Sequence, residues 1–545
     1  MEKSKHKYVF VVGGVLSGVG KGVTTASLGN IFKSKGFKVT AIKADPYINV
    51  DAGTMNPVEH GEVFVTDDGD ETDQDMGNYE RFLDVDLTST NYMTTGRVYT
   101  TVIQDERSMK YKGKCVQVVP DIPKEIIRRI EAAAKKSDSD IALIEIGGTV
   151  GEYENILFLE AARMMKLRDP SSVAFVLVSY LPVPSHLGEM KTKPTQHASR
   201  ALSSAGINAD IIIARGEKKL DKPRREKLAV FCGVHHENVV SAPDVKSIYE
   251  IPLTLEQQDM GNKLLKVFGW PARKSNMSEW KKFVARNNRV ENKVKIAVIG
   301  KYFGTGDYTL ADSYVSVIEA AKHAALYNGV YPELDWVDSE VFEKDPSKIK
   351  KLEKYDGIIV PGGFGTRGVE GIIKAIEFAR KRKIPYLGLC YGMQLATVEF
   401  VRNVIGRTEA NTVEMNPDTK EPVIHINPNQ EKNVRENHYG GTMRLGAYDC
   451  ILEKGSKTRK AYGKRKISER HRHRYEFNND YRELIEKAGL KVVGVNPESD
   501  LVEIVELADH PFFVGTQFHP EFKSRPMTPH PLFREFVAAA LKNKK

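Results

Sequence analysis

Short apolar runs without polar alternation constrain the fold of this chain most strongly. In the first half these runs are Tyr8–Val12, Val39–Ala44, Ile141–Ile146, Val173–Val178 and Asp210–Ala214. A strand buried on both faces needs continuous apolar side chains, whereas a strand with one solvated face alternates. Amphipathic segments such as Pro123–Lys136 and Ile156–Leu167 lie between the runs. We therefore expect a parallel sheet covered by helices on both faces.

The same rhythm restarts in the second half of the chain. Its strand-like runs are Lys295–Gly300, Gly357–Val360, Pro385–Leu389, Leu490–Val495 and Phe512–Phe518. Between the halves, residues 271–293 are polar and charge-rich, as in an interdomain connector, and Ser278–Ala285 has a helical pattern. We predict two doubly wound α/β domains, over residues 1–270 and 294–545, joined by a linker over 271–293.

The charge balance has two interpretations. The formal net charge is +9, which suits either nucleic acid or a small polyanionic substrate. Because the basic residues are scattered and no nucleic-acid-binding motif accompanies them, we favour the small substrate. The four cysteines form no CxxC pair, and apolar runs such as Val173–Val178 are far shorter than the roughly 20 residues that span a bilayer. We expect a cytoplasmic protein that binds neither membrane nor nucleic acid.

A nucleophile elbow is the clearest chemical motif. Cys390 lies in Gly388-Leu389-Cys390-Tyr391-Gly392, after an apolar strand and before the helical run Met393–Val401. A sharp strand-to-helix turn exposes the nucleophile, and small flanking residues avoid clashes there. The helix N-terminus also favours a thiolate. The alternative interpretation is a buried structural cysteine.

Two further motifs favour catalysis at Cys390. His519-Pro520-Glu521 ends the strand Phe512–Phe518 and supplies a base with a carboxylate to orient it. The loop Pro361–Gly365 can point backbone N–H groups at an oxyanion. The three motifs, in this order, resemble the class I glutamine amidotransferase family over roughly residues 293–540. The resemblance implies that the cysteine attacks the glutamine carboxamide, ammonia leaves, and water releases glutamate from a thioester. Tyr391 stands where many relatives carry Leu.

A glycine-rich segment, Gly13–Gly22, follows the first strand and opens a helix. Such a loop can surround phosphate oxygens with backbone N–H groups, and Lys21 would lie beside them. The segment departs from the strict P-loop pattern because Gly22 stands where Ser or Thr is expected; a flexible glycine turn is the alternative. Glu145, at the end of its strand, and the acidic stretch Asp67–Asp75 are candidate ligands for the Mg²⁺ that accompanies ATP. A solvated loop is the other interpretation of most of that stretch.

Longer segments resemble the CTP synthase family over essentially the whole chain. They are Lys43–Asp51, His60–Val65, Glu145–Gly151, Lys191–His197 and Gly441–Gly446. The resemblance implies an N-terminal P-loop-like synthetase domain and a C-terminal class I glutamine amidotransferase domain. Together they would use ATP and glutamine to aminate UTP to CTP through a 4-phosphorylated intermediate. It also implies Mg²⁺, a homotetramer with nucleotide sites between subunits, activation by GTP and feedback inhibition by CTP. Filament formation is compatible with such activity.

Carried over residue by residue, the resemblance implies four binding sites. ATP would contact Gly18, Val19, Gly20, Lys21, Gly22, Val23, Asp75, Asp244 and Val245. The metal ligands would be Asp75 and Glu145. UTP or CTP would contact Ser17, Glu152, Tyr153, Glu154, Lys191, Thr192, Lys193, Pro194, Thr195, Gln196 and Lys227. Glutamine would contact Gly363, Tyr391, Gly392, Met393, Gln394, Glu414 and Arg474. Glu152-Tyr153 replaces an Asp-Ile pair that is common in the family, which bears on feedback inhibition.

Three other functions stay open at this point: a different ATP-driven amidotransferase, a non-catalytic scaffold or filament protein, and a nucleic-acid-binding module. The C-terminal motifs do not separate the first from CTP synthase, whereas the N-terminal segments do. The intact catalytic motifs argue against a scaffold. His471 and His473 do not predict a metal site, because Arg472 and Arg474 alternate with them and repel a cation. A guanidinium fork for the glutamine carboxylate is the better role for Arg474.

Overall fold

The computed structural model describes residues 5–544 except 187, 291, 302–303, 306–307, 310 and 427–441. At Val58, Arg289 and residues 304–305, 308–309 and 311–312 only the backbone is described. Gly441, the first residue of one segment that resembles the CTP synthase family, lies outside these residues. The chain divides into two compact units, Met1–Ala52 with Asp75–Val284 and Gly53–Gln74 with Ala285–Lys545.

The first unit contains a seven-stranded parallel sheet with the order β5-β2-β6-β1-β7-β8-β9. Its strands are β1 (Lys7–Gly14), β2 (Val39–Asp45), β5 (Tyr92–Thr94), β6 (Ile141–Ile146), β7 (Val173–Tyr180), β8 (Ile211–Gly216) and β9 (Val239–Pro243). The five strands predicted for this half are confirmed. Because β6 and β7 lie on opposite sides of β1, the strand order reverses at β1, where open α/β sheets bind ligands.

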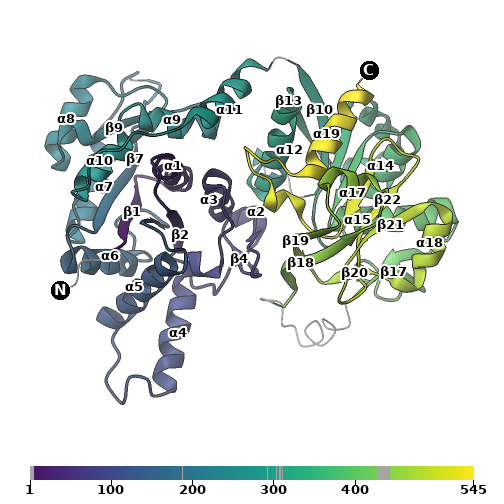
Figure 1. Ribbon diagram of the computed structural model, residues 1–545, viewed down its shortest axis with the longest axis horizontal. Helices are drawn as coiled ribbons and strands as arrows, with labels where there is room; N and C mark the ends of the chain where they lie inside the picture. The colour runs from purple at the N-terminus through teal and green to yellow at the C-terminus, as the bar shows by residue number, and fades with distance from the viewer. Residues whose placement is uncertain are drawn as a thin grey trace. The chain divides into compact units, whose positions relative to one another are not determined.

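Helices cover both faces of this sheet, as predicted. They are α1 (Lys21–Ser34), α3 (Asp75–Leu83), α4 (Thr95–Arg107), α5 (Val118–Lys136), α6 (Ile156–Arg168), α7 (Lys193–Ser204), α8 (Lys222–Cys232), α9 (Ile251–Glu256) and α10 (Met260–Val267). Figure 1 shows α5 and α6 on one side of β1 and β2, with α1 on the other. Phe10 and Val12 of β1 share one buried cluster with Ile126 of α5 and Phe158 of α6.

Most of the expected linker packs on the first unit. Its helix, α11 (Ser278–Arg289), begins where the sequence pattern indicates. The Trp280 indole Nε1 donates to the Tyr249 carbonyl at 2.8 Å, and the Trp280 ring lies 5.3 Å from that of Phe82. Trp280 and Phe283 form a buried apolar face on this helix. The polar composition of the surrounding stretch gave no indication of it.

The segment Gly53–Gln74 belongs to the second unit, although the sequence places it inside the first expected domain. It carries α2 (Pro57–His60) and a hairpin of β3 (Phe64–Val65) and β4 (Glu71–Thr72). The Arg470 guanidinium pairs with Asp67, and Arg472 Nε lies 2.8 Å from Glu71 Oε1. Partners about 400 positions apart leave no local pattern, so composition and periodicity could not predict this packing.

The second unit is built on a nine-stranded mixed sheet with the order β13-β10-β14-β15-β23-β22-β21-β18-β19. Its strands are β10 (Lys293–Gly300), β13 (Tyr331–Asp338), β14 (Gly357–Val360), β15 (Tyr386–Leu389), β18 (Arg444–Leu452), β19 (Lys466–His473), β21 (Leu490–Val495), β22 (Val502–Leu507) and β23 (Phe513–Thr516). Pairing is parallel from β13 to β23 and antiparallel from β23 to β19. The antiparallel extension is an addition to the doubly wound core.

Alternate residues of the central strands face opposite helical layers. Ile358 and Val360 share a buried cluster with α14 (Val369–Arg382) and α15 (Tyr391–Phe400). Ile359 packs instead with α12 (Val315–Tyr327) and α19 (Pro531–Asn543). The remaining elements are α13 (Glu340–Lys344), α17 (Lys457–Tyr462), α18 (Arg482–Ala488), β11 (Gly304–Thr305), β12 (Tyr308–Thr309), β16 (Ala410–Thr412), β17 (Glu421–Ile426) and β20 (Tyr475–Phe477).

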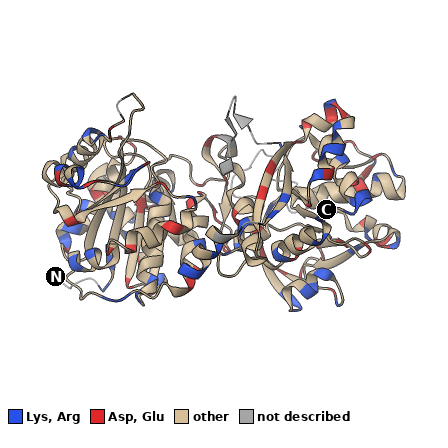
Figure 2. Cartoon of the chain, turned by 90° about the horizontal axis from the view of Figure 1, so that it is seen from above, with Lys and Arg blue, Asp and Glu red and all other residues tan. Residues whose placement is uncertain are grey.

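Basic and acidic residues are interspersed along the elements of each unit, as the colours in Figure 2 show. Among the described residues, none of the helices combines the length and apolar composition that crossing a membrane requires.

The substitution Trp280→Ala tests the docking of α11 on the first unit. Truncating a buried Trp costs about 3–5 kcal/mol, and it removes the donor to the Tyr249 carbonyl. Calorimetry should show a lower midpoint for the first unit and an unchanged one for the second. Lys281→Ala, at an exposed position of the same helix, is the matched control and should change neither. A wild-type transition in Trp280→Ala would contradict the docking.

Candidate functional site

Cys390 occupies a strained turn between β15 and α15. Its backbone has φ 50° and ψ −98°, a region that residues other than glycine rarely adopt. A Cβ on Gly388 would lie 2.6 Å from the Tyr386 hydroxyl, and one on Gly392 would lie 2.3 Å from the Val360 carbonyl oxygen. Both flanking positions therefore require glycine because of close approach, and the predicted strand–turn–helix is present.

His519 links Glu521 to Cys390. Its Nδ1 lies 2.8 Å from Glu521 Oε1, and its Nε2 has no oxygen or nitrogen partner among the described residues. Burial lowers the pKa of His519, but the charges of Glu521 and Cys390, with hydrogen bonds to both, outweigh burial and raise the pKa to about 10. The imidazole thus holds its proton beside the sulfur, as a Cys–His pair with an orienting carboxylate requires.

A cavity of about 100 Å³ in the second unit opens onto these three side chains. The loop after β14 contributes Gly362, Gly363 and Phe364 to its wall. A Cβ on Gly362 would lie 2.8 Å from Cε1 of His519, so glycine is needed for the loop to approach the imidazole. The segment Gly53–Gln74 adds Pro57, Glu62 and Val63, none of which the sequence motifs had identified as lining residues.

The candidate glutamine ligands Gly363, Tyr391, Glu414 and Arg474 gather around the same loop. Glu414 Oε1 accepts from the Gly365 backbone N at 2.8 Å, and the Tyr391 hydroxyl donates to the Gly365 carbonyl at 2.8 Å. Burial raises the pKa of Glu414, and the charge of Arg474 opposes that rise. Gly363 lies beside Tyr391, because a Cβ there would be 3.5 Å from Cδ1 of the ring. The Glu414 carboxylate thus borders the loop, and the Arg474 guanidinium lies near enough to influence its pKa.

The next three candidates, Gly392, Met393 and Gln394, direct their side chains elsewhere. Gly392 packs against β14, and Met393 is fully buried in the core. Gln394 Nε2 donates to the Tyr475 carbonyl at 3.0 Å. In this arrangement their contact with glutamine would come from the backbone.

The glycine-rich loop of the first unit leads into α1. Gly20, at the helix N-cap, has φ 88°. Lys21 is buried, and its Nζ donates to the Gly148 carbonyl at 2.8 Å. A Cβ on Gly22 would lie 1.8 Å from Asp75 Oδ1. The departure from the P-loop pattern at Gly22 therefore has a steric reason, since the Asp75 carboxylate fills the space that a Ser or Thr side chain needs.

Lys43 joins the two candidate metal ligands, although the motifs did not single it out. Its Nζ lies 2.6 Å from Asp75 Oδ2 and 2.9 Å from Glu145 Oε1. Burial, followed by the charge of Asp75, raises the pKa of Glu145 to about 7. Burial likewise raises the pKa of Asp45, 3.7 Å from Lys43, to about 6. A lysine inside a strand buried on both faces was the available sequence signal.

This donor set suits Mg²⁺. The described residues contain no group of three or more His, Cys, Asp and Glu side chains arranged to hold a metal alone. Mg²⁺ commonly takes one or two carboxylates and completes its shell with phosphate oxygens and water. Asp75 and Glu145 would supply such oxygens beside the glycine-rich loop, where the Lys43 ammonium now pairs with both carboxylates.

The candidate pyrimidine-nucleotide residues lie after β1, β6 and β7 and on α8. Ser17, Glu152–Glu154, Lys193 and Lys227 are exposed, whereas Thr192, Thr195 and Gln196 are buried and Lys191 and Pro194 are intermediate. Contacts occur within segments: Glu152 Oε2 accepts from Thr149 N at 2.8 Å, and Gln196 Nε2 donates to Thr192 Oγ1 at 3.1 Å. In the part of the chain that the structure describes, no hydrogen bond joins one segment to another.

Asp244, a candidate adenine contact after β9, is tied to the glycine-rich loop through Arg215. The guanidinium lies 3.0 Å from Asp244 Oδ1 and within 3.5 Å of the position that a Cβ on Gly20 would take. The sequence motifs did not single out Arg215, which lies next to the end of an otherwise apolar strand. Val245 follows at an intermediate depth.

Comparison with known proteins gives concordant matches. The family model described as CTP synthase N-terminus matches residues 7–270, and the one described as glutamine amidotransferase class-I matches residues 309–539. The CTP synthase of Carboxydothermus hydrogenoformans is 51% identical over 540 residues, 99% of each chain. That of Caldanaerobacter subterraneus subsp. tengcongensis is 50% identical over 536 residues, 98% of each.

A solved structure, the glutaminase domain of Trypanosoma brucei CTPS with bound acivicin, is 40% identical, with a TM-score of 0.42, and covers 46% of this chain and 94% of that one. The alignments with these two CTP synthases cover nearly the full length of this chain, and therefore both of its units. The chain belongs to the CTP synthase family, and its reaction is the ATP-using, glutamine-dependent conversion of UTP to CTP in pyrimidine biosynthesis.

Proposed function

We propose that Cys390, His519 and Glu521 hydrolyse glutamine, and that the loop Gly18–Val23 with Asp75 and Glu145 activates UTP. The observation that carries this proposal is the His519 imidazole, which lies 2.8 Å from the Glu521 carboxylate and lines one cavity with Cys390. A buried structural cysteine needs neither an orienting carboxylate nor a cavity.

In the glutaminase reaction the Cys390 thiolate attacks the carboxamide carbon of glutamine. Backbone N–H groups of the loop around Gly363 stabilise the oxyanion, and His519 gives its proton to the departing ammonia. His519 then takes a proton from water, which attacks the thioester and releases glutamate. Arg474 holds the substrate carboxylate, and Glu414 holds its ammonium group.

In the synthetase reaction the loop amides and Lys21 hold the ATP phosphates. The uracil 4-oxygen attacks the terminal phosphorus, the bond to ADP breaks, and a 4-phosphorylated UTP results. Mg²⁺, which Asp75 and Glu145 would hold, supplies charge neutralisation at the phosphates, and Lys21 stabilises the charge that develops during transfer. Ammonia then attacks carbon 4, and phosphate leaves to give CTP.

Nucleotide control belongs to the same proposal. UTP and the inhibitor CTP share the segments at Ser17, Glu152–Glu154, Lys191–Gln196 and Lys227. The exposure of many of these residues in one chain supports a homotetramer in which a second copy completes each site. GTP activates glutamine hydrolysis, filaments are compatible with activity, and the enzyme works in the cytoplasm.

The substitution Cys390→Ala tests the separation of the two reactions. With ATP, Mg²⁺, UTP and glutamine, CTP formation should fall by at least about 10³-fold, since the nucleophile is gone. With ammonium chloride in place of glutamine, CTP formation should match the wild type. Equal loss with both nitrogen sources would contradict separate sites, and no CTP from the wild type with either source would refute the function.

The substitution Lys21→Ala should abolish CTP formation with both glutamine and ammonia, by about 10²–10³-fold, because it removes charge stabilisation at the transferred phosphate. Glutamine hydrolysis, measured as glutamate, should persist. Lys218→Ala, an exposed lysine after β8, serves as control. Ammonia-driven turnover at the wild-type rate in Lys21→Ala would refute the role of this lysine.

The substitution Glu521→Gln should make the Cys390–His519 pair sensitive to pH. The negative charge of Glu521 raises the pKa of His519. Removing that charge should lower the pKa of His519, so that the imidazole loses its proton at a lower pH than in the wild type. Alkylation of Cys390 by iodoacetamide should vary little from pH 7 to 9 in the wild type and steeply in Glu521→Gln. Glutaminase kcat should fall about 10²-fold or more. The control is the exposed Glu535→Gln; identical alkylation profiles would contradict the assignment.

A further inference from the structure

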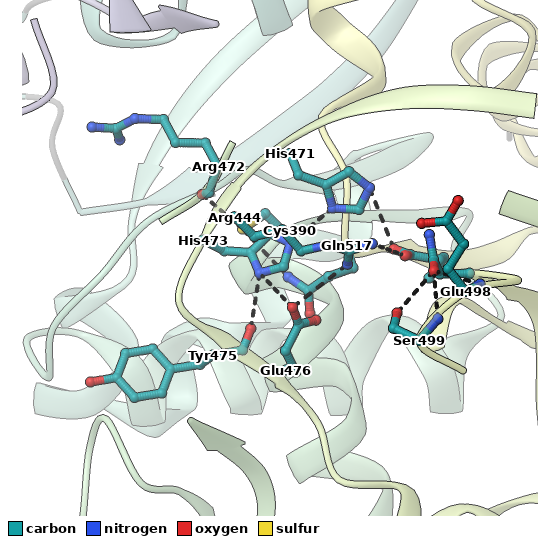
Figure 3. Close-up of polar contacts among 12 residues, drawn as sticks. Cys390, Arg444, His471, Arg472, His473, Tyr475, Glu476, Glu498, Ser499 and Gln517 are labelled. Carbon is teal, nitrogen blue, oxygen red and sulfur yellow. Dashed lines mark hydrogen bonds and ion pairs between the residues drawn. The ribbon is translucent and has the colours of Figure 1, made fainter. Parts of the chain in front are cut away.

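Gln517 lies against the reacting sulfur, and the glutaminase steps above do not use it. It follows β23 directly, two positions before His519, and is fully buried. Its backbone N donates to the Glu503 carbonyl at 2.8 Å, which fixes the main chain. Its side-chain Nε2 lies 3.7 Å from Cys390 Sγ. Figure 3 shows Gln517 beside Cys390, in the cluster of polar residues that also includes Tyr475.

The hydrogen bonds around Gln517 determine which end of its amide faces the sulfur. Gln394 Nε2 donates both to the Tyr475 carbonyl at 3.0 Å and to Gln517 Oε1 at 3.4 Å. Because a backbone carbonyl only accepts, Gln394 must present its NH₂ group. Because an NH₂ group only donates, Gln517 must present its oxygen to Gln394. Its own NH₂ group is thereby directed at Cys390.

The other neighbours of the sulfur explain why a donor matters there. The Arg472 carbonyl oxygen, 3.9 Å from Sγ, suits a protonated thiol but repels a thiolate. His519 supplies one cationic donor to the sulfur. Cys390 itself is buried, so little water is available to solvate a negative sulfur. A second protein donor is therefore worth more than it would be at an exposed site.

We propose that Gln517 is a further catalytic residue of the glutaminase reaction, an N–H donor to the Cys390 sulfur, and that Gln394 positions it. This inference rests on the proposed role of Cys390 as nucleophile. In the second half of the reaction, water adds to the thioester carbon and the C–S bond breaks. The electron pair returns to sulfur, where the Gln517 N–H and the His519 imidazolium receive the charge. Thioester hydrolysis is thus the step that depends most on Gln517.

The main test is Gln517→Met, which keeps an unbranched side chain of similar length but has no N–H donor. At pH 7.5 the alkylation of Cys390 by iodoacetamide should slow about tenfold, equivalent to about 1.4 kcal/mol and in the range of a hydrogen bond to a charged group. Glutaminase kcat should fall at least as much, with the KM for glutamine within about twofold. Mass spectrometry of acid-quenched enzyme should detect more glutamyl thioester than in the wild type.

Two measurements separate this role from a structural one. Ammonia-driven CTP formation and the midpoint of thermal unfolding should stay near wild-type values in Gln517→Met. A second variant, Gln517→Glu, keeps the oxygen that faces Gln394 and replaces the donor. The ratios of its alkylation rate and kcat to those of the wild type should be lowest near pH 8. Both ratios should rise as pH falls, because a protonated carboxyl regains a donor.

Wild-type alkylation and kcat in a folded Gln517→Met, or a change in KM alone, would overturn the inference. If Gln517→Met fails the folding controls, the pH profile of Gln517→Glu decides, and a profile parallel to the wild type would overturn it. Undiminished use of glutamine by Cys390→Ala would instead refute the nucleophile, which is the failure of the proposed function itself.

Discussion

The backbone N–H of Cys390 donates to the Thr516 carbonyl at 2.6 Å, and the glutaminase site that we propose depends on this bond. It continues the parallel register in which Leu389 of β15 pairs with Thr516 of β23. Both strands end at the same edge of the sheet. The residues that follow them therefore meet there: Cys390 after β15, and Gln517 to His519 after β23. Strand register, and not sequence proximity, brings together side chains that are over 120 positions apart.

The same constraint organises the synthetase unit. Lys43 of β2 is the register partner of Glu145 of β6, which places an ammonium beside a carboxylate in the interior of a parallel sheet. Asp75, at the start of α3, completes the cluster because Gly22 leaves room for its carboxylate. Burial raises the pKa of two carboxyls of this cluster, Asp45 and Glu145, although the charge of Lys43 opposes the rise.

Much of the fold could be predicted from local pattern. The strands β1, β2, β6, β7 and β8 are continuous apolar runs, and a run of that kind fits only a strand covered on both faces. The elbow at Cys390 could also be predicted, because its two glycines are needed for steric reasons. A Cβ at Gly388 or Gly392 would lie only 2.6 or 2.3 Å from a neighbouring oxygen. The buried face of α11 was not recognised, since it is only a few residues wide and lies within a polar stretch.

Neighbouring residues encode the two α/β units, the elbow, the His519-Pro520-Glu521 motif and the glycine-rich loop, through strand burial, close backbone approach or turn geometry. These features could therefore be predicted from local sequence. The packing of Gly53–Gln74 with the second unit, and the approach of Gln517 to the sulfur, became visible only in the folded chain. Those facts depend on ion pairs and hydrogen bonds between residues tens to hundreds of positions apart. Such partners are chosen by the register and packing of the folded chain, which leave no periodic signal along it.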